Sequence, residues 1–163
     1  GDVYKRQQLE SLGITLAAIF AVMAILWRSF KLATIALLTS LGPIAILTIL
    51  GSLYQVPLNS VSVMVGALAL SIGIDDTVHL ITHWLSMKRN GANENDALTK
   101  TLEVKGPAIV CTSLILIGFS LSLLWMSFPP VAHFGWLSAA AYIAALVNAL
   151  WILPSFLGKK RLS

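Results

Sequence analysis

The sequence predicts an all-helical integral membrane protein, a bundle of five transmembrane helices with one short amphipathic helix at the cytoplasmic surface. Hydrophobic residues make up 57% of the chain and charged residues only 11%, with a mean hydropathy of +0.84. The apolar residues are gathered into five blocks of about 20 residues, the length that a helix needs to cross about 30 Å of hydrocarbon. Between these blocks, Lys and Arg occur only in alternate connections. This composition excludes a water-soluble core.

Each apolar block is taken as one spanning helix. The first block is the shortest, and its outer end is the least clearly defined. Gly42 and Pro43 lie inside the second block and predict a kink, because proline removes a backbone donor and its ring displaces the preceding turn. The predicted spans are Ser11–Trp27, Leu32–Leu53, Ser60–Leu80, Pro107–Met126 and Phe134–Leu157.

A shorter helix is expected between the third and fourth spans. Asn93 is a suitable N-cap, and acidic residues follow it in the first turn. Apolar residues then recur at helical spacing, which predicts an amphipathic helix over residues 94–104 lying on the cytoplasmic surface. We expect Gly106-Pro107 to end this helix and to start the next span.

The loop charges predict the orientation of the bundle, since cytoplasmic connections retain Lys and Arg. The two outer connections, residues 54–59 and 127–133, contain neither residue type. We therefore expect the N-terminus outside and the C-terminus in the cytoplasm. The nine basic residues assigned to the inner side are Arg28, Lys31, Lys88, Arg89, Lys100, Lys105, Lys159, Lys160 and Arg161.

The two ends of the chain are expected to lie outside the bundle. The segment Asp2–Gln7 resembles the translation of a transposon-end adapter used in sequencing libraries, so residues 1–8 are interpreted as an adapter-derived segment or, alternatively, a polar outer tail. Residues 9–158 then form a five-helix transmembrane domain. Residues 159–163 form a basic cytoplasmic tail.

The main functional candidates are Asp75 and Asp76, two adjacent carboxylates within the third span. An ionised carboxylate in hydrocarbon costs at least about 2.5 kcal/mol on insertion scales, so such residues usually serve a function. Burial and a neighbouring like charge both disfavour the ionised form. We therefore expect at least one of the pair to exchange a proton near neutrality, as a proton relay requires. The alternative is a pair locked by hydrogen bonds that holds the bundle together.

His79 lies one helical turn after the aspartates, on the same side of the helix, and could pass protons between them and water. A purely structural role, in which His79 makes a hydrogen bond and carries no proton, is an equal alternative. Thr112 and Ser113 on the fourth span are possible hydrogen-bond partners of the carboxylates, although bonding to their own backbone is the commoner use of such hydroxyls.

Other classes fit less well. An intramembrane aspartyl protease needs carboxylates that converge from separate helices, whereas neighbours on one helix diverge by about 100°. Asp75, His79 and His83 form a stripe that could suit Zn or Mn, but no second helix supplies a further acidic or His ligand, so no metal is expected. Cys111 is alone and is expected to be a buried, inert thiol. No enzymatic activity, cofactor or nucleic-acid partner is predicted.

The segment Gly66–Leu80, with its core Ser-Ile-Gly-Ile-Asp-Asp-Thr-Val-His-Leu, resembles the fourth or tenth transmembrane helix of the resistance-nodulation-division superfamily. The nearer likeness is its lipid-exporter branch, which includes the mycobacterial membrane protein large family and the hopanoid transporters. Further matching landmarks are Trp27–Lys31, Val56–Asn59, Pro129-Pro130 and Leu153-Pro154. By this resemblance the chain corresponds to helices two to six or eight to twelve of a full transporter.

The resemblance implies proton-driven export of lipids or other hydrophobic compounds across the bacterial cytoplasmic membrane, with Asp75 and Asp76 as the proton relay. It also implies partners: membrane lipid, the hydrophobic substrate, the second half of the transporter with its extracytoplasmic domains, and further copies in an oligomer. The intramembrane Lys that pairs with the aspartates in the drug-efflux branch has no counterpart here. Because the same five-helix unit is similar to a sterol-sensing domain, a non-transporting lipid-sensing module is the alternative.

Overall fold

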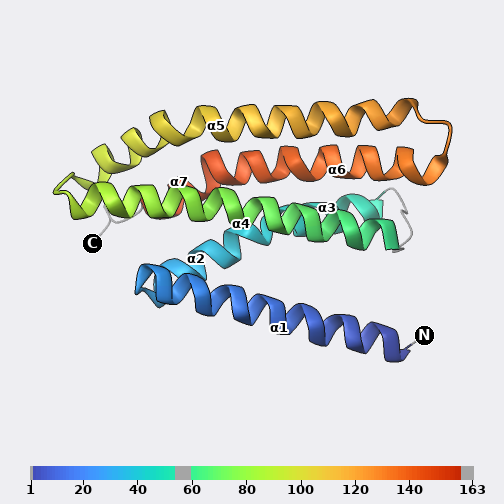
Figure 1. The fold of residues 1–163 in the computed structure, drawn as a ribbon, viewed down its shortest axis with the longest axis horizontal. Coiled ribbons are helices and arrows are strands. Elements are labelled where there is room, and N and C mark those ends of the chain that lie inside the picture. The colour runs from blue at the N-terminus through green and yellow to red at the C-terminus, as the bar shows by residue number, and fades with distance from the viewer. Residues whose placement is uncertain (1, 54–59, 159–163) are drawn as a thin grey trace.

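The computed structural model describes residues 2–53 and 60–158, and all regular structure in these two segments is helical (Figure 1). The predicted all-helical class is therefore confirmed. The predicted outer connection at residues 54–59 and the basic tail at 159–163 lie outside the described residues. The elements are α1 (Asp2–Trp27), α2 (Phe30–Ser40), α3 (Gly42–Leu53), α4 (Ser60–Arg89), α5 (Glu94–Ser122), a 3-10 turn η1 (Leu123–Trp125), α6 (Pro129–Val147), a π-helical turn η2 (Asn148–Ile152) and α7 (Leu153–Leu157).

Among the described residues, four helical segments are long and apolar enough to cross a membrane. The remaining predicted span, at the N-terminal side, corresponds to a shorter apolar stretch, Gly13–Trp27, within the longer helix α1. Four of the five predicted spans thus have the expected length, and the first falls short of it. The four segments are Phe30–Leu50, Val63–Arg89, Glu94–Trp125 and Pro129–Leu157.

Helices α4, α5 and α6 pack against one another, and α5 lies at one edge of the bundle (Figure 1). Helix α1 packs mainly on α2 and reaches α4 at its own C-terminal end. That end of the bundle also holds the last turn of α4, with Lys88 and Arg89, and we call it the basic end. A sharp turn joins α1 to α2 there, with Arg28 at a positive φ of 53° and the Ser29 hydroxyl capping α2.

At the kink predicted for Gly42-Pro43, the structure interrupts the helix at Leu41. Helix α2 ends at Ser40, Leu41 forms a turn, and α3 begins at Gly42. Proline at the second position of α3 lacks only a donor that would be unpaired at a helix start. The proline therefore sacrifices no backbone hydrogen bond at this position.

The prediction of a separate amphipathic helix over residues 94–104 is wrong. Residues 94–104 are the first turns of one continuous helix, α5, and Pro107 lies inside it. Figure 1 shows these first turns inclined to the rest of α5, so the proline bends the helix without ending it. The carbonyl that loses its donor belongs to Glu103, an exposed residue near the basic end.

The N-terminal segment is also helical, because α1 begins at Asp2. Residues 2–8, expected as an adapter-derived or outer tail, thus continue the first helix without a break. The origin of these residues stays a prediction.

Two apolar clusters hold the bundle together. One lies toward the basic end and includes Trp27, Leu80, Trp84 and Leu153. The other lies farther from that end and joins α4 to α6. It consists of Val65, Ala69, Leu137 and Ala141.

Gly135 marks the closest approach between α5 and α6. A Cβ at this position would lie 2.6 Å from the carbonyl oxygen of Ser120 and 2.9 Å from the Cβ of Leu123. No side chain fits there without moving the two helices apart.

Candidate functional site

The two aspartates of α4 occupy different environments. The side chain of Asp75 is 72% exposed, whereas Asp76 is only 7% exposed. Successive residues on a helix point about 100° apart, so one carboxylate faces outward and the other faces the packed interior. The two carboxylates predicted from the sequence as a pair therefore have different surroundings, and each has its own neighbours.

Asp75 belongs to a stripe of exposed polar residues on α4. Its Oδ1 lies 3.5 Å from Nε2 of His79, one turn away, and the His79 side chain is 62% exposed. This confirms that the two side chains share a face, as the i,i+4 spacing predicts. Similar spacing continues the row in both directions. We call the row the polar stripe: Ser71, Asp75, His79, Thr82 and Ser86, all exposed in this chain.

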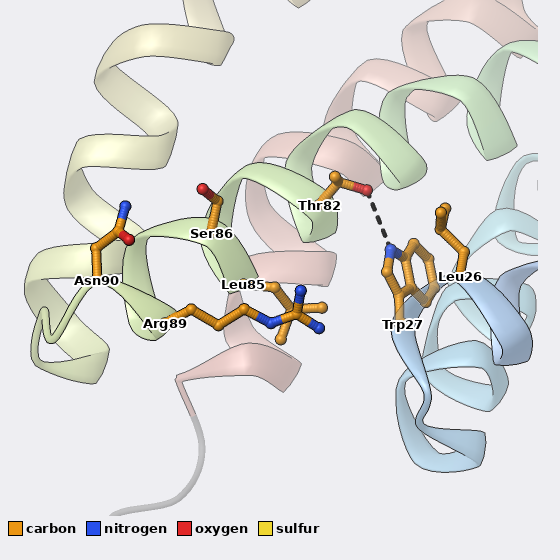
Figure 2. A pocket seen from close by; sticks show the side chains of 7 residues that line it. All are labelled: Leu26, Trp27, Thr82, Leu85, Ser86, Arg89 and Asn90. Atoms are coloured by element: carbon orange, nitrogen blue, oxygen red, sulfur yellow. Dashed lines mark hydrogen bonds between the residues drawn. The ribbon is translucent and has the colours of Figure 1, made fainter.

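The basic end of the polar stripe opens into a shallow pocket of about 280 Å³ between α1 and α4 (Figure 2). The indole Nε1 of Trp27 donates a hydrogen bond of 3.0 Å to the Thr82 hydroxyl at its edge. The Arg89 side chain extends along α4 beside this pocket (Figure 2). The polar stripe thus leads toward a basic group. The full lining is Leu26, Trp27, Thr82, Leu85, Ser86, Arg89 and Asn90.

Asp76 faces a region with few available hydrogen-bond donors. The Thr77 hydroxyl beside it donates to the carbonyl of Gly73 at 2.7 Å. The Ser40 hydroxyl from α2 donates to the carbonyl of Ala36 at 2.7 Å and lies 3.4 Å from the Thr77 hydroxyl. Both hydroxyls therefore direct protons toward backbone oxygens, and Oδ2 of Asp76 is buried without a partner among the described residues.

The two expected partners on α5 lie away from the carboxylates. The hydroxyl of Thr112 donates to the carbonyls of Ala108 and Ile109, at 3.0 and 3.1 Å, and its side chain is exposed. Such bonding to the helix's own backbone is the commoner use of a threonine in a helix.

Ser113 is buried on α5. The antiparallel helices α4 and α5 are joined nearer the basic end by a contact of 3.0 Å between Nδ1 of His83 and the Thr101 hydroxyl. Among the described residues no hydrogen bond joins Ser113 to Asp75 or Asp76, and Oδ2 of Asp76 has no partner. The structure therefore brings His79 to Asp75 but does not bring Thr112 or Ser113 to either carboxylate.

One buried polar residue was missed by reasoning from the sequence. Asn148 is 1% exposed at the start of the π-helical turn η2, and neither atom of its amide has a partner among the described residues. A π-turn leaves backbone groups out of the regular pattern and often occurs at functional sites. A single Asn in an apolar block has no periodic signal, so only the fold reveals its burial.

Metal ligands do not gather in the part of the chain that the structure describes. No group of three or more His, Cys, Asp or Glu side chains is close enough to hold an ion there. The ring of His83, part of the stripe considered for zinc, contacts Thr101 on α5. Cys111 is exposed on α5, so the expectation of a buried thiol is wrong.

A helical bundle that crosses the membrane and carries ionisable side chains inside one spanning helix defines an integral membrane protein with a charged intramembrane site. The chain belongs to the MMPL family, whose profile matches residues 2–159. It is also 25% identical, over 158 residues, to a protein of Methanocaldococcus jannaschii that is named only as a membrane protein. That match covers 96% of this chain and 40% of the relative, so the chain spans about two fifths of the relative's length. No solved structure matches the chain.

Proposed function

We propose that this chain is part of a proton-driven exporter of lipids or other hydrophobic compounds, and that Asp75, Asp76 and His79 form its proton relay. Membership of the MMPL family supports the transporter class. The single observation that carries the relay is the placement of two carboxylates within a membrane-crossing helix, one of them buried and the other beside a histidine. Ionisable residues at such depth commonly mark proton pathways.

The polar stripe supports the view that this chain is incomplete by itself. A row containing Asp75 and His79 would be costly against lipid, because charged groups within a bilayer normally face protein or water. We infer that another protein surface covers this row in the assembled transporter. The remaining three fifths of a relative such as the archaeal protein would be long enough to provide it.

The relay is tested in the complete transporter by changing Asp75 and Asp76 separately to Asn, and His79 to Gln. The assay loads the hydrophobic substrate into inverted membrane vesicles, imposes a proton gradient, and follows both substrate movement and dissipation of the gradient. We expect either aspartate change to abolish substrate-coupled proton flux while the protein still inserts. The His79 change should slow the flux, because water can partly replace the imidazole.

The matched control is Asp96→Asn, the same chemical change at an exposed residue in the first turn of α5. It should leave transport unchanged. Full export by both Asn variants at Asp75 and Asp76 would contradict the relay. If those variants also kept a response to membrane lipid, a lipid-sensing module would be the better assignment.

A further inference from the structure

Asn148 and Asp76 are placed at the same depth by the packing of α4 against α6. The two helices run in the same direction and share the apolar cluster that contains Ala69 and Ala141. Asp76 follows Ala69 by seven residues on α4, and Asn148 follows Ala141 by seven residues on α6. Seven residues are about two helical turns, so both side chains return to the shared interface at one level.

Both side chains are buried there with unused hydrogen-bonding capacity. Oδ2 of Asp76 and both polar atoms of the Asn148 amide lack a partner among the described residues. Buried polar atoms are nearly always hydrogen-bonded, to protein or to ordered water, because leaving one unpaired costs about 1–3 kcal/mol. Two such groups that face one interface from adjacent helices can satisfy each other's hydrogen-bonding capacity.

The backbone near these two side chains is irregular at two places, the π-turn η2 and the break between α2 and α3. Asn148 begins the π-turn η2, and its Oδ1 lies 3.5 Å from the position of a Cβ on Gly42, at the break between α2 and α3. The Ser40 hydroxyl, just before the same break, lies against Thr77, the neighbour of Asp76. The region thus offers several polar atoms, enough for the two to four partners that a buried water needs.

We propose that Asn148 is the inner partner of Asp76, and that the amide and the carboxyl share a buried water molecule. This proposal rests on the proposed relay. An amide both donates and accepts hydrogen bonds, whereas an ionised carboxylate only accepts and a protonated one also donates. Asn148 can therefore satisfy Asp76 in both protonation states. The helix break and the π-turn beside it are places where a small rearrangement between the two states is least costly.

Few other titratable groups surround Asp76 at this depth. On α4 itself they are Asp75 and His79, which lie on the exposed polar stripe. Helix α6 carries the buried Tyr142 and, near its start, the exposed His133. Helix α5 carries the exposed Cys111, and its charged residues all lie between its start and Pro107: Glu94, Asp96, Lys100, Glu103 and Lys105. The described residues of α2 and α3 offer only Lys31, at the basic end.

The test is infrared difference spectroscopy between acidic and neutral pH on the 163-residue chain in lipid vesicles. Asp76→Asn identifies the carboxyl band of Asp76 by removing it. Asn148→Leu keeps the branching and the number of heavy atoms of the side chain, at a somewhat larger volume, and removes the amide. We expect this change to move the Asp76 band to higher frequency, as for a carboxyl that loses a hydrogen bond. The matched control is Ser138→Ala, another buried and unpartnered polar residue on α6, ten residues earlier. It should leave the band in place.

A second measurement does not depend on titration. A double-mutant cycle with Asp76→Leu and Asn148→Leu, followed by thermal unfolding in detergent, should give non-additive losses, with the double variant more stable than the sum of the single effects predicts. A cycle that pairs Asp76→Leu with Ser138→Ala should be additive.

The proposal is overturned by an unmoved Asp76 band in a folded Asn148→Leu chain, or by additivity in the first cycle. These outcomes leave the transport test of the aspartates untouched. Conversely, normal export by the Asp76→Asn transporter would refute the relay while a non-additive cycle still supported the contact.

Discussion

Gly135 provides the sharpest test of how the bundle is packed. Replacing it by Ala would place a Cβ 2.6 Å from the carbonyl oxygen of Ser120, whose position is fixed by the backbone of α5. Real Cβ contacts do not approach so closely, so α5 and α6 must separate by roughly 1 Å. A radial gap of about 0.5–1 Å forfeits a quarter to a half of each dispersion contact across it. Overpacking of this kind typically costs about 1–3 kcal/mol.

The opposing effect is the helix propensity of Ala, which exceeds that of Gly by at most about 1 kcal/mol. We therefore expect a net loss of about 1–2 kcal/mol in the free energy of unfolding. The assay follows helicity in mixed micelles as the denaturing detergent fraction increases. The matched control is Gly118→Ala on α5, where nothing lies within 4 Å of the added Cβ. The control should be neutral or slightly stabilised. Equal stability of the two variants would refute the close approach.

Two further predictions concern contacts near the basic end. Thr82→Val removes the acceptor of the Trp27 indole and should destabilise the chain by about 0.5–1.5 kcal/mol, with a change in Trp fluorescence as α1 loosens from α4. An unchanged spectrum would argue against this contact. Glu94→Gln removes the partner of Lys88, 3.2 Å away and partly exposed, and should cost less than about 1 kcal/mol. Raising the salt concentration should shrink this difference, and a salt-independent loss would point to packing instead.

The sequence predicts the helices well because each signal is local. An apolar block of membrane-spanning length has few alternatives to a helix, because its backbone hydrogen bonds must be satisfied within the block. The second block is interrupted next to Gly42-Pro43, where a kink was expected. Pro107 carries the same chemical signal, yet it bends α5 without ending it. The difference arises from surroundings: the carbonyl it leaves unpaired belongs to an exposed residue near the basic end. Proline statistics alone do not contain that information.

The candidate site was only partly readable from the chain. The i,i+4 spacing correctly places His79 beside Asp75, because helix geometry fixes that relation. The register between helices is a tertiary property: it leaves Ser113 without a hydrogen bond to the aspartates among the described residues, and it underlies the proposed pairing of Asn148 with Asp76. No pattern within α6 distinguishes Asn148 from an asparagine that faces solvent. Its burial follows from the packing of small residues on α4 and α6.

The different burial of Asp75 and Asp76 bears on how a relay on one helix would work. Two carboxylates on one face would repel each other and share one solvent environment, so a proton could move between them without any change in the helix. Pointing about 100° apart, Asp75 lies on the exposed polar stripe and Asp76 faces the packed interior. A proton that passes from one to the other must move around α4 from its exposed face to its packed face, so protonation on one face can bias the packing on the other. Such a helix would link protonation to movement between two parts of a transporter, which neither aspartate could do alone.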